Sequence, residues 1–503
     1  MVTLADIESA RKTIADSVFL SPCAYSETFS RLTGNRIYFK LENLQMTGSF
    51  KERGAANKLL SLTAEERARG VVTASAGNHA QGVAYHATRL GIHAKICMPV
   101  STPLIKVSST RDFGAEVILT GANFDEAREE AERICEAEDL TFVHPFDDDA
   151  VIAGQGTIGL ELLEQQPDLE AVVVPIGGGG LIGGIAAYVK RVRPEVRIVG
   201  VQPEDSDAMA RSLAAGRRVL LPHVGLFADG VAVKQVGEET FRLARKYVDE
   251  VITVDTDAIC AALKDVFEDT RAILEPAGAL AIAGVKAWVA RERVEGRTLA
   301  AIACGANMNF DRLRFVAERA ELGEQREAIL AVTIPERPGS FRAFCALLGK
   351  RSVTEFNYRY ADPHVAHLFV GIEVADRRET ERLLAALKES RIEASDLSDN
   401  EMAKLHVRHL VGGHAPAAEH EILYRFEFPE RPGALMQFLD SMSAGWNISL
   451  FHYRNHGDDY GRVLVGMQVP PGDSRAFRDF LDRLGYDYVD ESANPAYRMF
   501  LGR

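Results

Sequence analysis

Residues 1–325 alternate between short apolar runs and longer amphipathic stretches, and this alternation constrains the possible folds more than any other feature of the chain. Helical patterns, such as Asn123–Asp139 and Gly237–Val248, separate the apolar runs. We therefore expect a mostly parallel sheet covered by helices on both faces. Ligands bind beyond the carboxyl ends of strands in such sheets, so functional residues are expected directly after the runs. The predicted strands are Arg36–Leu41, Gly70–Ala74, His93–Met98, Ala115–Leu119, Ala171–Ile176, Arg197–Val201, Val251–Val254 and Thr298–Ala303.

A lysine stands in a small-residue turn at Thr47–Gly54, which reads TGSFKERG. Gly48 and Ser49 predict a turn, and Ser49 is expected to be the N-cap of a following helix. Lys51 would then project from the first helical turn. A lysine fixed in this way suits Schiff-base chemistry with a carbonyl cofactor. A solvated surface lysine is the alternative.

The segment Ser75–Gly82, SAGNHAQG, follows a predicted strand. Gly77 allows a tight turn, and Asn78 is expected to cap a helix that runs to Leu90. The free N–H groups of such a turn favour an anion such as a carboxylate. An ordinary strand-to-helix connection with an asparagine cap explains the segment equally well.

Four consecutive glycines open the segment Gly177–Gly184, GGGGLIGG, after another predicted strand. Consecutive glycines cost backbone entropy, and a fold tolerates them where the backbone must approach a ligand closely. Before a helix, the expected ligand is a phosphate, with a flexible loop as the alternative. No Gly-Lys-Ser/Thr follows, so this is no Walker A loop, and the lone Glu204 is weak support for a dinucleotide site.

A further segment, Ala303–Phe310, reads ACGANMNF and places Cys304 at a strand end, where a buried structural cysteine is the simpler interpretation. A turn-held lysine, an anion loop and a phosphate loop on one sheet fit a cofactor that has both an aldehyde and a phosphate. Pyridoxal phosphate has both groups.

These segments, together with EPAGA at Glu275–Ala279, resemble in order and spacing the fold type II (tryptophan-synthase-like) pyridoxal-phosphate enzymes. Among them the biosynthetic threonine dehydratases are the most similar, and the resemblance covers essentially the whole chain. It implies a catalytic core of mostly parallel sheets, followed by regulatory domains. The implied cofactor is pyridoxal 5′-phosphate.

The resemblance also implies roles for single residues. Lys51 would bind the cofactor covalently and remove the substrate α-proton, Phe50 would pack near the pyridine ring, and Asn78 would bond the ring hydroxyl. Glu275 is expected near the cofactor. The residues expected to cradle the phosphate are Gly177, Gly178, Gly179, Gly180 and Leu181. Those expected at the substrate carboxylate are Ser75, Gly77, Asn78 and His79.

Two positions bear on the type of reaction. Cys304 stands where the family often has a serine facing the pyridine nitrogen, and a thiol is a weaker donor than a hydroxyl. A ring nitrogen without a carboxylate partner makes a weaker electron sink, which favours prompt elimination. Ala76 stands where the similar serine racemases have a second serine that acts as acid and base. An alanine cannot carry a proton, so elimination is favoured over racemisation.

The implied activity is β-elimination from L-threonine to 2-oxobutanoate and ammonia, the first step of isoleucine biosynthesis. One alternative is a serine/threonine dehydratase or a serine racemase of the same superfamily. Another, from a different class, is an amino-acid sensor built on an inactive enzyme. The combined presence of Lys51, the Asn78 loop and the glycine loop argues against the sensor.

An internal repeat occupies the last third of the chain. The sequence PERPG at 335–339 returns at 429–433, an offset of 429 − 335 = 94, and FNYR at 356–359 returns as FHYR at 451–454. Each copy reads strand, helix, strand, strand, helix, strand, the ferredoxin-like order, and resembles the ACT-like domains that sense amino acids. The predicted domains are 1–325 (catalytic), 326–411 and 421–503 (both ACT-like), with a linker at 412–420. In the first copy the predicted strands are 329–334, 353–359 and 367–374, and the helices 340–349 and 379–390.

The ACT-like copies imply feedback inhibition by isoleucine, with valine as a second candidate effector. Tyr358 and Tyr453 occupy equivalent positions and are predicted to line two related effector sites, with strand packing as the alternative. A purely assembling role for the repeats is the alternative to regulation. By resemblance we expect a homotetramer.

Composition excludes several other classes of function. The formal net charge of −14 argues against a nucleic-acid binder or an anionic-membrane binder. The six cysteines include no CxxC pair, no histidine has metal-ligand spacing, and we predict no metal site. Scattered cysteines and the lack of a signal-peptide pattern favour a cytoplasmic protein, and no apolar run has membrane length.

Overall fold

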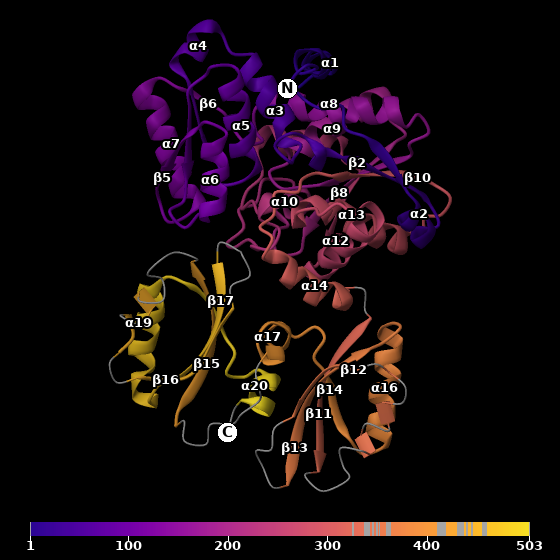
Figure 1. Ribbon diagram of the computed structural model, residues 1–503, viewed down its shortest axis with the longest axis vertical. Helices are drawn as coiled ribbons and strands as arrows, with labels where there is room; N and C mark the ends of the chain where they lie inside the picture. The colour runs from indigo at the N-terminus through magenta and orange to yellow at the C-terminus, as the bar shows by residue number, and fades with distance from the viewer. Residues whose placement is uncertain are drawn as a thin grey trace. The chain divides into compact units, whose positions relative to one another are not determined.

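The chain divides into two compact units, Met1–Val316 and Ala317–Arg503, which are described one at a time (Figure 1). Among the residues that the structure describes, no helix is both long enough and apolar enough to span a membrane. The computed structural model describes residues 2–323, 326–335, 343–344, 347–348, 351, 353–358, 364–409, 419–429, 437–438, 441–443, 446–454 and 460–501.

The first unit contains two sheets, where the sequence pattern predicted one. The six-stranded sheet is parallel except at the β1–β2 pair, which is antiparallel. The four-stranded sheet is parallel throughout. The larger sheet has the order β1 (Cys23–Ser26), β2 (Arg36–Leu41), β10 (Thr298–Ala303), β7 (Ala171–Pro175), β8 (Arg197–Pro203) and β9 (Glu250–Val254). The smaller has the order β5 (Glu116–Leu119), β4 (Ala94–Met98), β3 (Val71–Ala74) and β6 (Thr141–Phe142).

The predicted strands are all present, and β2 and β10 have the predicted bounds. Two strands were missed, β1 and β6. β6 is two residues long, too short to give a hydrophobic pattern. The alternation of apolar runs alone did not predict the division into two sheets, because the order of strands depends on contacts between distant segments, which local periodicity does not record. The family resemblance implied mostly parallel sheets, in agreement with the structure.

Helices cover these sheets, and those predicted at 123–139 and 237–248 are confirmed as α7 and α11. The helices of the first unit are α1 (Leu4–Thr13), α2 (Glu27–Thr33), α3 (Lys51–Leu60), α4 (Ala64–Arg69), α5 (Asn78–Arg89), α6 (Leu104–Asp112), α7 (Phe124–Glu138), α8 (Asp149–Gln165), α9 (Gly180–Val192), α10 (Ala208–Ala215), α11 (Glu238–Tyr247), α12 (Thr256–Thr270) and α13 (Pro276–Glu292). Helix α14 (Arg312–Gly323) runs across the boundary between the units.

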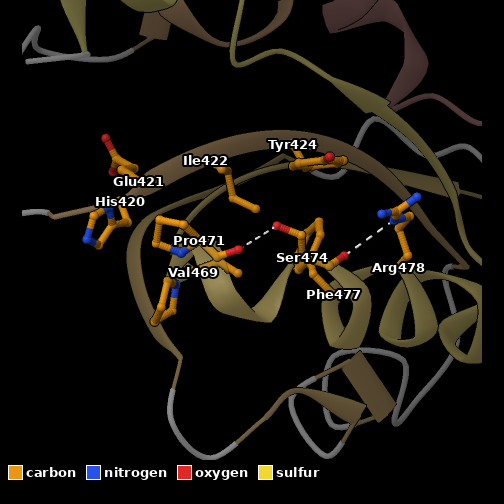
Figure 2. Close-up of a pocket in the computed structure, with 10 residues that line it drawn as sticks. His420, Glu421, Ile422, Tyr424, Val469, Pro471, Ser474, Phe477 and Arg478 are labelled. Carbon is orange, nitrogen blue, oxygen red and sulfur yellow. Dashed lines mark hydrogen bonds between the residues drawn. The ribbon is translucent and has the colours of Figure 1, made fainter.

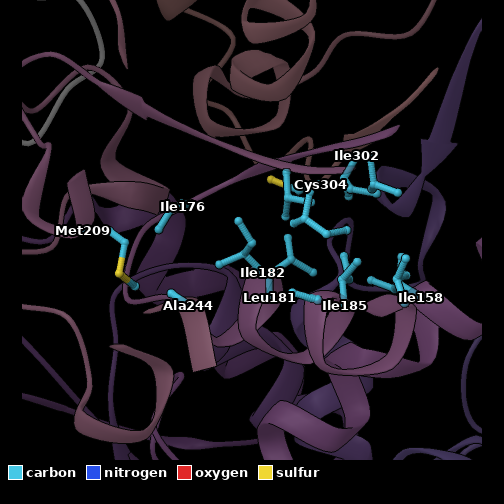
Figure 3. Close-up of a cluster of buried hydrophobic side chains, with 14 of the residues drawn as sticks. Ile158, Ile176, Leu181, Ile182, Ile185, Met209, Ala244, Ile302 and Cys304 are labelled. Carbon is cyan, nitrogen blue, oxygen red and sulfur yellow. The ribbon is translucent and has the colours of Figure 1, made fainter. Parts of the chain in front are cut away.

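The core of the larger sheet fixes the loops that follow its strands (Figure 3). Ile182 and Ile185 of α9 pack with Ile302 of β10 in one buried apolar cluster. Leu181, at the start of α9, and Cys304, just after β10, belong to the same cluster. The hydrophobic effect thereby holds the loop after β7 against the loop after β10.

Helix α3 lies unusually close to α8. A Cβ added to Gly54 would lie 2.8 Å from Val151, and one added to Gly154 would lie 2.6 Å from the Arg53 carbonyl oxygen. Glycine at both positions lets the two backbones meet. Because α8 is anchored in the core, this contact sets the position of α3 and of Lys51 at its start.

The second unit contains two antiparallel sheets that repeat each other, which confirms the sheet pattern of the predicted repeat. Their orders are β12-β13-β11-β14 and β16-β17-β15-β18. The first copy comprises β11 (Glu327–Pro335), β12 (Val353–Tyr358), β13 (Val365–Glu373), α16 (Arg377–Glu389), β14 (Glu393–Asp396) and α17 (Glu401–Leu405). The second comprises β15 (Glu421–Pro429), β16 (Asn447–Arg454), β17 (Tyr460–Gln468), α19 (Ser474–Leu484), β18 (Asp487–Asp490) and α20 (Pro495–Phe500). The helix predicted at 340–349 lies mostly outside the described residues.

The two copies share a core. Ile329 and Phe369 of the first copy pack in one buried cluster with Leu423 and Leu464 of the second. Asn400, which caps α17, donates through Nδ2 to Oδ1 of its counterpart Asn494 at 3.3 Å. The copies therefore pack against each other within one compact unit.

Candidate active site

The lysine turn is paired with the loop after β10. The Phe50 N–H donates to the Cys304 carbonyl at 3.0 Å, and the Ala306 N–H donates to the Gly48 carbonyl at 2.9 Å. The predicted N-cap role of Ser49 is wrong, because α3 begins at Lys51 and Phe50 holds the N-cap position. The buried Ser49 hydroxyl has no hydrogen-bond partner among the residues that the structure describes.

Lys51 projects into a partly buried site and meets a neutral partner. Its Nζ donates to the Pro145 carbonyl at 2.7 Å and lies 5.3 Å from the centroid of the Phe50 ring. Burial lowers the pKa of Lys51 to about 8, and the neighbouring acidic groups of Cys304 and Glu275, which would attract the ammonium when ionised, oppose this only in part. An amine with this pKa is partly neutral near pH 7–8, as a nucleophile or general base requires.

The loop after β3 carries Asn78, whose predicted role as a helix cap is wrong. Gly77 holds the N-cap position of α5, and Asn78 is the first helical residue. The Asn78 side chain instead donates to Glu275 Oε1 at 2.6 Å and accepts from Asn307 Nδ2 at 2.8 Å. Ser75 Oγ accepts from the N–H groups of Gly77 and Ala80, each at 3.3 Å, which fixes the turn.

His79 faces the protein interior. Its Nε2 lies 3.0 Å from the Val143 carbonyl oxygen, and its side chain is buried. Burial, reinforced by the charge of Lys51, lowers the pKa of His79 to about 3. The imidazole is therefore neutral at physiological pH, so any contact of His79 with a substrate carboxylate would come from its backbone N–H. By contrast, a Cβ added to Gly77 would meet nothing within 4 Å, so the loop is open there.

The glycine loop connects β7 to α9. Gly179 has a φ of +97°, which glycine adopts readily, and the N–H groups of the first turn of α9 follow it. Thr240 Oγ1 donates to the Gly178 carbonyl at 2.7 Å and holds the loop from one side. A Cβ on Gly178 would lie 2.3 Å from the Phe146 ring. Glycine is thus required at Gly178 by close packing and favoured at Gly179 by backbone conformation, which argues against the alternative of a flexible loop.

Glu275 and Cys304 close the site next to Asn78. Burial, followed by the charge of Asp229, raises the pKa of Glu275 to about 7. The Cys304 thiol donates to the Ala277 carbonyl at 3.2 Å, and burial keeps its pKa well above the ordinary value. Cys304 is therefore a neutral thiol, and it directly follows β10, at the strand end that the sequence predicted.

Asp229 forms a charge cluster that the sequence analysis missed. It accepts from Lys106 Nζ at 2.7 Å and from the Arg312 guanidinium at 3.3 Å. Burial would raise the pKa of Asp229, but these two cations hold it well below its usual range. No sequence signal links three residues that are so far apart in the chain.

A second missed cluster lies behind α3. The buried Arg53 guanidinium bonds Glu42 at 2.7 Å and Glu161 at 2.8 Å, and Lys40 Nζ bonds Glu161 at 2.6 Å. The side chains of these four residues are fully buried. Their charges balance, as buried charges must.

Residues 14–305 match a family model described as pyridoxal-phosphate-dependent enzyme, and residues 318–407 and 413–501 match the C-terminal regulatory domain of threonine dehydratase. The chain is 57% identical to the biosynthetic L-threonine dehydratase IlvA of Burkholderia multivorans over 97% of both chains. It belongs to the threonine dehydratase family. It is a pyridoxal-phosphate-dependent lyase with a fold type II catalytic core and ACT-like regulatory domains, as the sequence predicted.

Solved structures resemble the catalytic part of this threonine dehydratase family member. The processed form of threonine deaminase isoform 2 from Solanum lycopersicum has a TM-score of 0.62 and 45% identity, covering 63% of this chain and 87% of that chain. Maize serine racemase has a TM-score of 0.60 and 34% identity, covering 63% of this chain and 98% of that chain.

The residues of the site fit pyridoxal phosphate. A lysine amine of lowered pKa suits its aldehyde, and a glycine cradle at the start of α9 suits its phosphate. The buried Ser49 hydroxyl, two residues before Lys51, has no hydrogen-bond partner within the described part of the chain and is a polar group that a ligand would satisfy.

In the regulatory unit, Tyr358 lies on β12 opposite Leu368, and Tyr453 lies on β16 opposite Val463. Their side chains lie outside the described part, so the predicted effector role stays a prediction. A pocket of about 450 Å³ lies elsewhere in the second copy, lined by Ile422 on β15 and by Ser474, Phe477 and Arg478 of α19 (Figure 2).

Proposed function

We propose that the chain is an L-threonine ammonia-lyase that forms 2-oxobutanoate and ammonia by β-elimination. The observation that carries the proposal is the Lys51 amine, whose pKa is lowered to about 8. Its partner Pro145 precedes Phe146, which packs against Gly178 of the glycine loop. The relative from Burkholderia multivorans, named as an L-threonine dehydratase, supports threonine as the substrate.

In this proposal, pyridoxal phosphate supplies a carbonyl for covalent attachment and withdraws electrons from the substrate α-carbon. Lys51 attaches the cofactor and, once released, takes the substrate α-proton on Nζ. The Pro145 carbonyl, 2.7 Å from Nζ, holds the free amine at the site between these steps. A carbonyl accepts a hydrogen bond from a neutral amine, so this contact does not require a charged lysine.

The remaining residues bind and orient. Phe50 packs against the cofactor ring, Asn78 donates to its ring hydroxyl, and Glu275 fixes the Asn78 amide through their 2.6 Å hydrogen bond. Cys304 presents a neutral thiol near the ring nitrogen. The N–H groups assigned to the phosphate are those of Gly177, Gly178, Gly179, Gly180 and Leu181. The groups assigned to the substrate carboxylate belong to Ser75, Gly77, Asn78 and His79.

The alternative within the superfamily is a serine/threonine dehydratase or serine racemase. Ala76 has no proton to exchange on the face opposite Lys51, which favours elimination. The regulatory repeat favours a biosynthetic enzyme over either alternative. Bound cofactor without turnover of any hydroxy amino acid would instead support the amino-acid sensor.

For regulation, we propose that isoleucine inhibits the enzyme at the regulatory unit, that valine opposes it as a second effector, and that the activity is the first step of isoleucine biosynthesis. The match to a threonine dehydratase regulatory domain supports this. Inhibition between distant sites requires at least two states that differ in their contacts with the effector. We further propose a homotetramer that works in the cytoplasm.

The experiment measures 2-oxobutanoate formation from L-threonine over a range of threonine and isoleucine concentrations. We expect sigmoidal kinetics, with isoleucine raising the half-saturation point. Tyr358→Leu and Tyr453→Leu should weaken inhibition, while Tyr488→Leu, an exposed tyrosine on β18, serves as the matched control. Turnover that is blind to isoleucine would overturn the regulatory proposal, and no turnover of threonine in cofactor-loaded protein would overturn the catalytic one.

A further inference from the structure

Asn307 lies where three loops of the site meet. Its Nδ2 donates to the Thr47 carbonyl at 2.6 Å and to Asn78 Oδ1 at 2.8 Å. Both hydrogens of this one amide group are thereby used, one in the lysine turn and one in the loop after β3. Asn307 itself stands in the loop after β10, three residues beyond Cys304.

The lysine turn is held from both sides at Thr47. Its N–H donates to Glu52 Oε2 at 2.7 Å, and its hydroxyl donates to the same oxygen at 3.1 Å. Its carbonyl accepts from Asn307. Gly48 follows with a φ of +73°, and a Cβ there would lie 2.7 Å from Asn307 Oδ1. The Asn307 amide therefore contacts the turn before Lys51 at two consecutive residues, Thr47 and Gly48.

The same amide determines the orientation of the Asn78 side chain. Because Asn307 Nδ2 is a donor, the group of Asn78 that faces it must be the acceptor Oδ1. The Asn78 NH₂ group then faces Glu275, to which it donates at 2.6 Å. One of its hydrogens is used in that bond, and the other remains for the cofactor.

We propose that Asn307 is a positioning residue of the cofactor site: by donating to both Thr47 and Asn78, it fixes the lysine turn and sets the direction of the Asn78 amide. The inference rests on the role that the proposed function gives Asn78, as donor to the ring hydroxyl. As a consequence, the hydrogen-bond donors of the Asn307 amide, and not its volume, control the pKa of the ring hydroxyl of the cofactor.

An Asn307→Asp substitution tests this because it preserves shape and removes both donors. Thr47 O and Asn78 Oδ1 would each face a carboxylate oxygen. The Asn78 amide can avoid this repulsion by turning over, with Glu275 taking up a proton, since its pKa is raised to about 7, and donating to the turned oxygen. An oxygen then replaces the donor at the ring hydroxyl. Loss of a hydrogen bond to an ionised oxygen raises its pKa.

The measurements are made on the full chain without substrate. One is the equilibrium affinity of the cofactor-free protein for pyridoxal 5′-phosphate, and the other is the pH midpoint of the visible absorption change of the bound cofactor. For Asn307→Asp we expect affinity about tenfold weaker and a midpoint about one pH unit higher. Asn307→Ala should give smaller changes, because water can replace the lost amide.

Asn309→Asp is the matched control. Asn309 lies in the same loop, but its Oδ1 accepts from the Asp311 N–H at 3.2 Å, and an aspartate also accepts. We expect affinity and midpoint unchanged. The same chemical substitution should thus be silent where the asparagine accepts and disruptive where it donates.

A double variant shows whether Asn307 acts through Asn78. The midpoint of Asn78→Ala/Asn307→Asp should equal that of Asn78→Ala alone, since the group being oriented is then absent. Additive shifts would overturn the proposal. So would an Asn307→Asp midpoint equal to that of the wild type, or an Asn307→Ala effect larger than that of Asn307→Asp, which is the pattern of a space-filling role.

If Asn307→Asp does not fold, the same measurements are made on Asn307→Ser, whose hydroxyl can keep one of the two bonds. A smaller upward midpoint shift is then expected, and an unchanged midpoint overturns the inference. No substrate enters these measurements, so failure of the chain to turn over threonine would count against the proposed function and leave this result standing.

Discussion

Helix α3 begins with two cations in opposite surroundings, Lys51 on the side of the cofactor site and Arg53 on the side of α8. Arg53 is fully buried against the carboxylates of Glu42 and Glu161. Lys51 meets the neutral carbonyl of Pro145. The pKa of Lys51 is lowered to about 8 by burial, whereas Glu42 and Glu161 raise the pKa of Arg53 beyond its already high value despite burial.

The difference shows how one helix serves both structure and chemistry. Burial penalises both cations, and only the one with balancing charges keeps its proton firmly. Arg53 can therefore fix α3 in the core, while Lys51 is left with an amine that gives up its proton near physiological pH. Substitutions at Lys51 should therefore affect turnover, whereas substitutions around Arg53 should affect the free energy of unfolding.

The largest effect is expected from Lys51→Ala. We expect turnover of L-threonine to fall by at least about 10⁴-fold, since the residue is both the attachment point and the base. The stability of the cofactor-free protein should not decrease, because an unbalanced, partly buried cation is removed. Steady-state assays and thermal unfolding measure the two quantities.

Lys58→Ala is the control for that change. Lys58 lies on the same helix and pairs with Asp148 at 2.6 Å, away from the lysine turn. It should retain turnover. If Lys51→Ala retained turnover, or if both variants lost turnover equally, Lys51 would have no specific catalytic role.

The converse change is Glu161→Gln, which leaves Arg53 and Lys40 to share one carboxylate. We expect a loss of about 3–5 kcal/mol in the free energy of unfolding, the usual result of breaking a buried ion pair. The protein that remains folded should still turn over threonine. Urea unfolding of the cofactor-free protein measures the loss. Glu130→Gln, at a partly exposed position paired with the exposed Arg133, is a control that should show little change.

The pH dependence of this loss sharpens the prediction. Burial would raise the pKa of Glu161, but Arg53 and Lys40 lower it below the ordinary value. Its stabilisation is therefore present above the pKa of the unfolded state, about 4.3, and is lost as the pH falls through the lower folded value. The deficit of Glu161→Gln should shrink in acid. A deficit that is constant with pH would point to lost packing instead of lost charge.

A smaller effect is expected at Glu275, the acid beside the Lys51 site. Its folded pKa is raised to about 7, so the stability of the folded state decreases between the unfolded pKa of about 4.3 and pH 7. The wild type should therefore lose roughly 2–3 kcal/mol of its free energy of unfolding as the pH rises, and Glu275→Gln should not show this loss. Unfolding of the cofactor-free protein at pH 5 and pH 8 measures it. An unchanged difference between the two pH values would show that Glu275 is already ionised and able to pair with Lys51.

Local patterns in the sequence predicted the strands and the positions of the loops well. β2 and β10 have the predicted bounds because a glycine lies two residues before each apolar run, Gly34 before β2 and Gly296 before β10. The loops after β2, β7 and β10 lie together because parallel strands place their carboxyl ends at one edge of the larger sheet, whereas the Asn78 loop follows β3 of the smaller sheet. The repeat predicted two copies with the same sheet order, which the structure has.

Contacts between distant segments could not be predicted. Ser49 and Asn78 have cap-type side chains, yet neither caps a helix, because the loop after β10 pairs with one and Asn307 bonds the other. The Arg53 cluster joins residues of different elements with no shared motif. The Pro145 carbonyl offers no side chain from which its contact with Lys51 could be inferred. These contacts are the ones that tune the chemistry of the site.

The most direct test of this account is the rate at which the cofactor-free protein attaches pyridoxal phosphate to Lys51 as a function of pH. Attached cofactor is trapped by borohydride reduction and located by peptide mass spectrometry. We predict a rate that rises with a midpoint near pH 8, the pKa of an amine that lacks a balancing carboxylate. A midpoint near that of a free lysine, about 10.4, would contradict the account, because Lys51 would then be as firmly protonated as a solvated side chain.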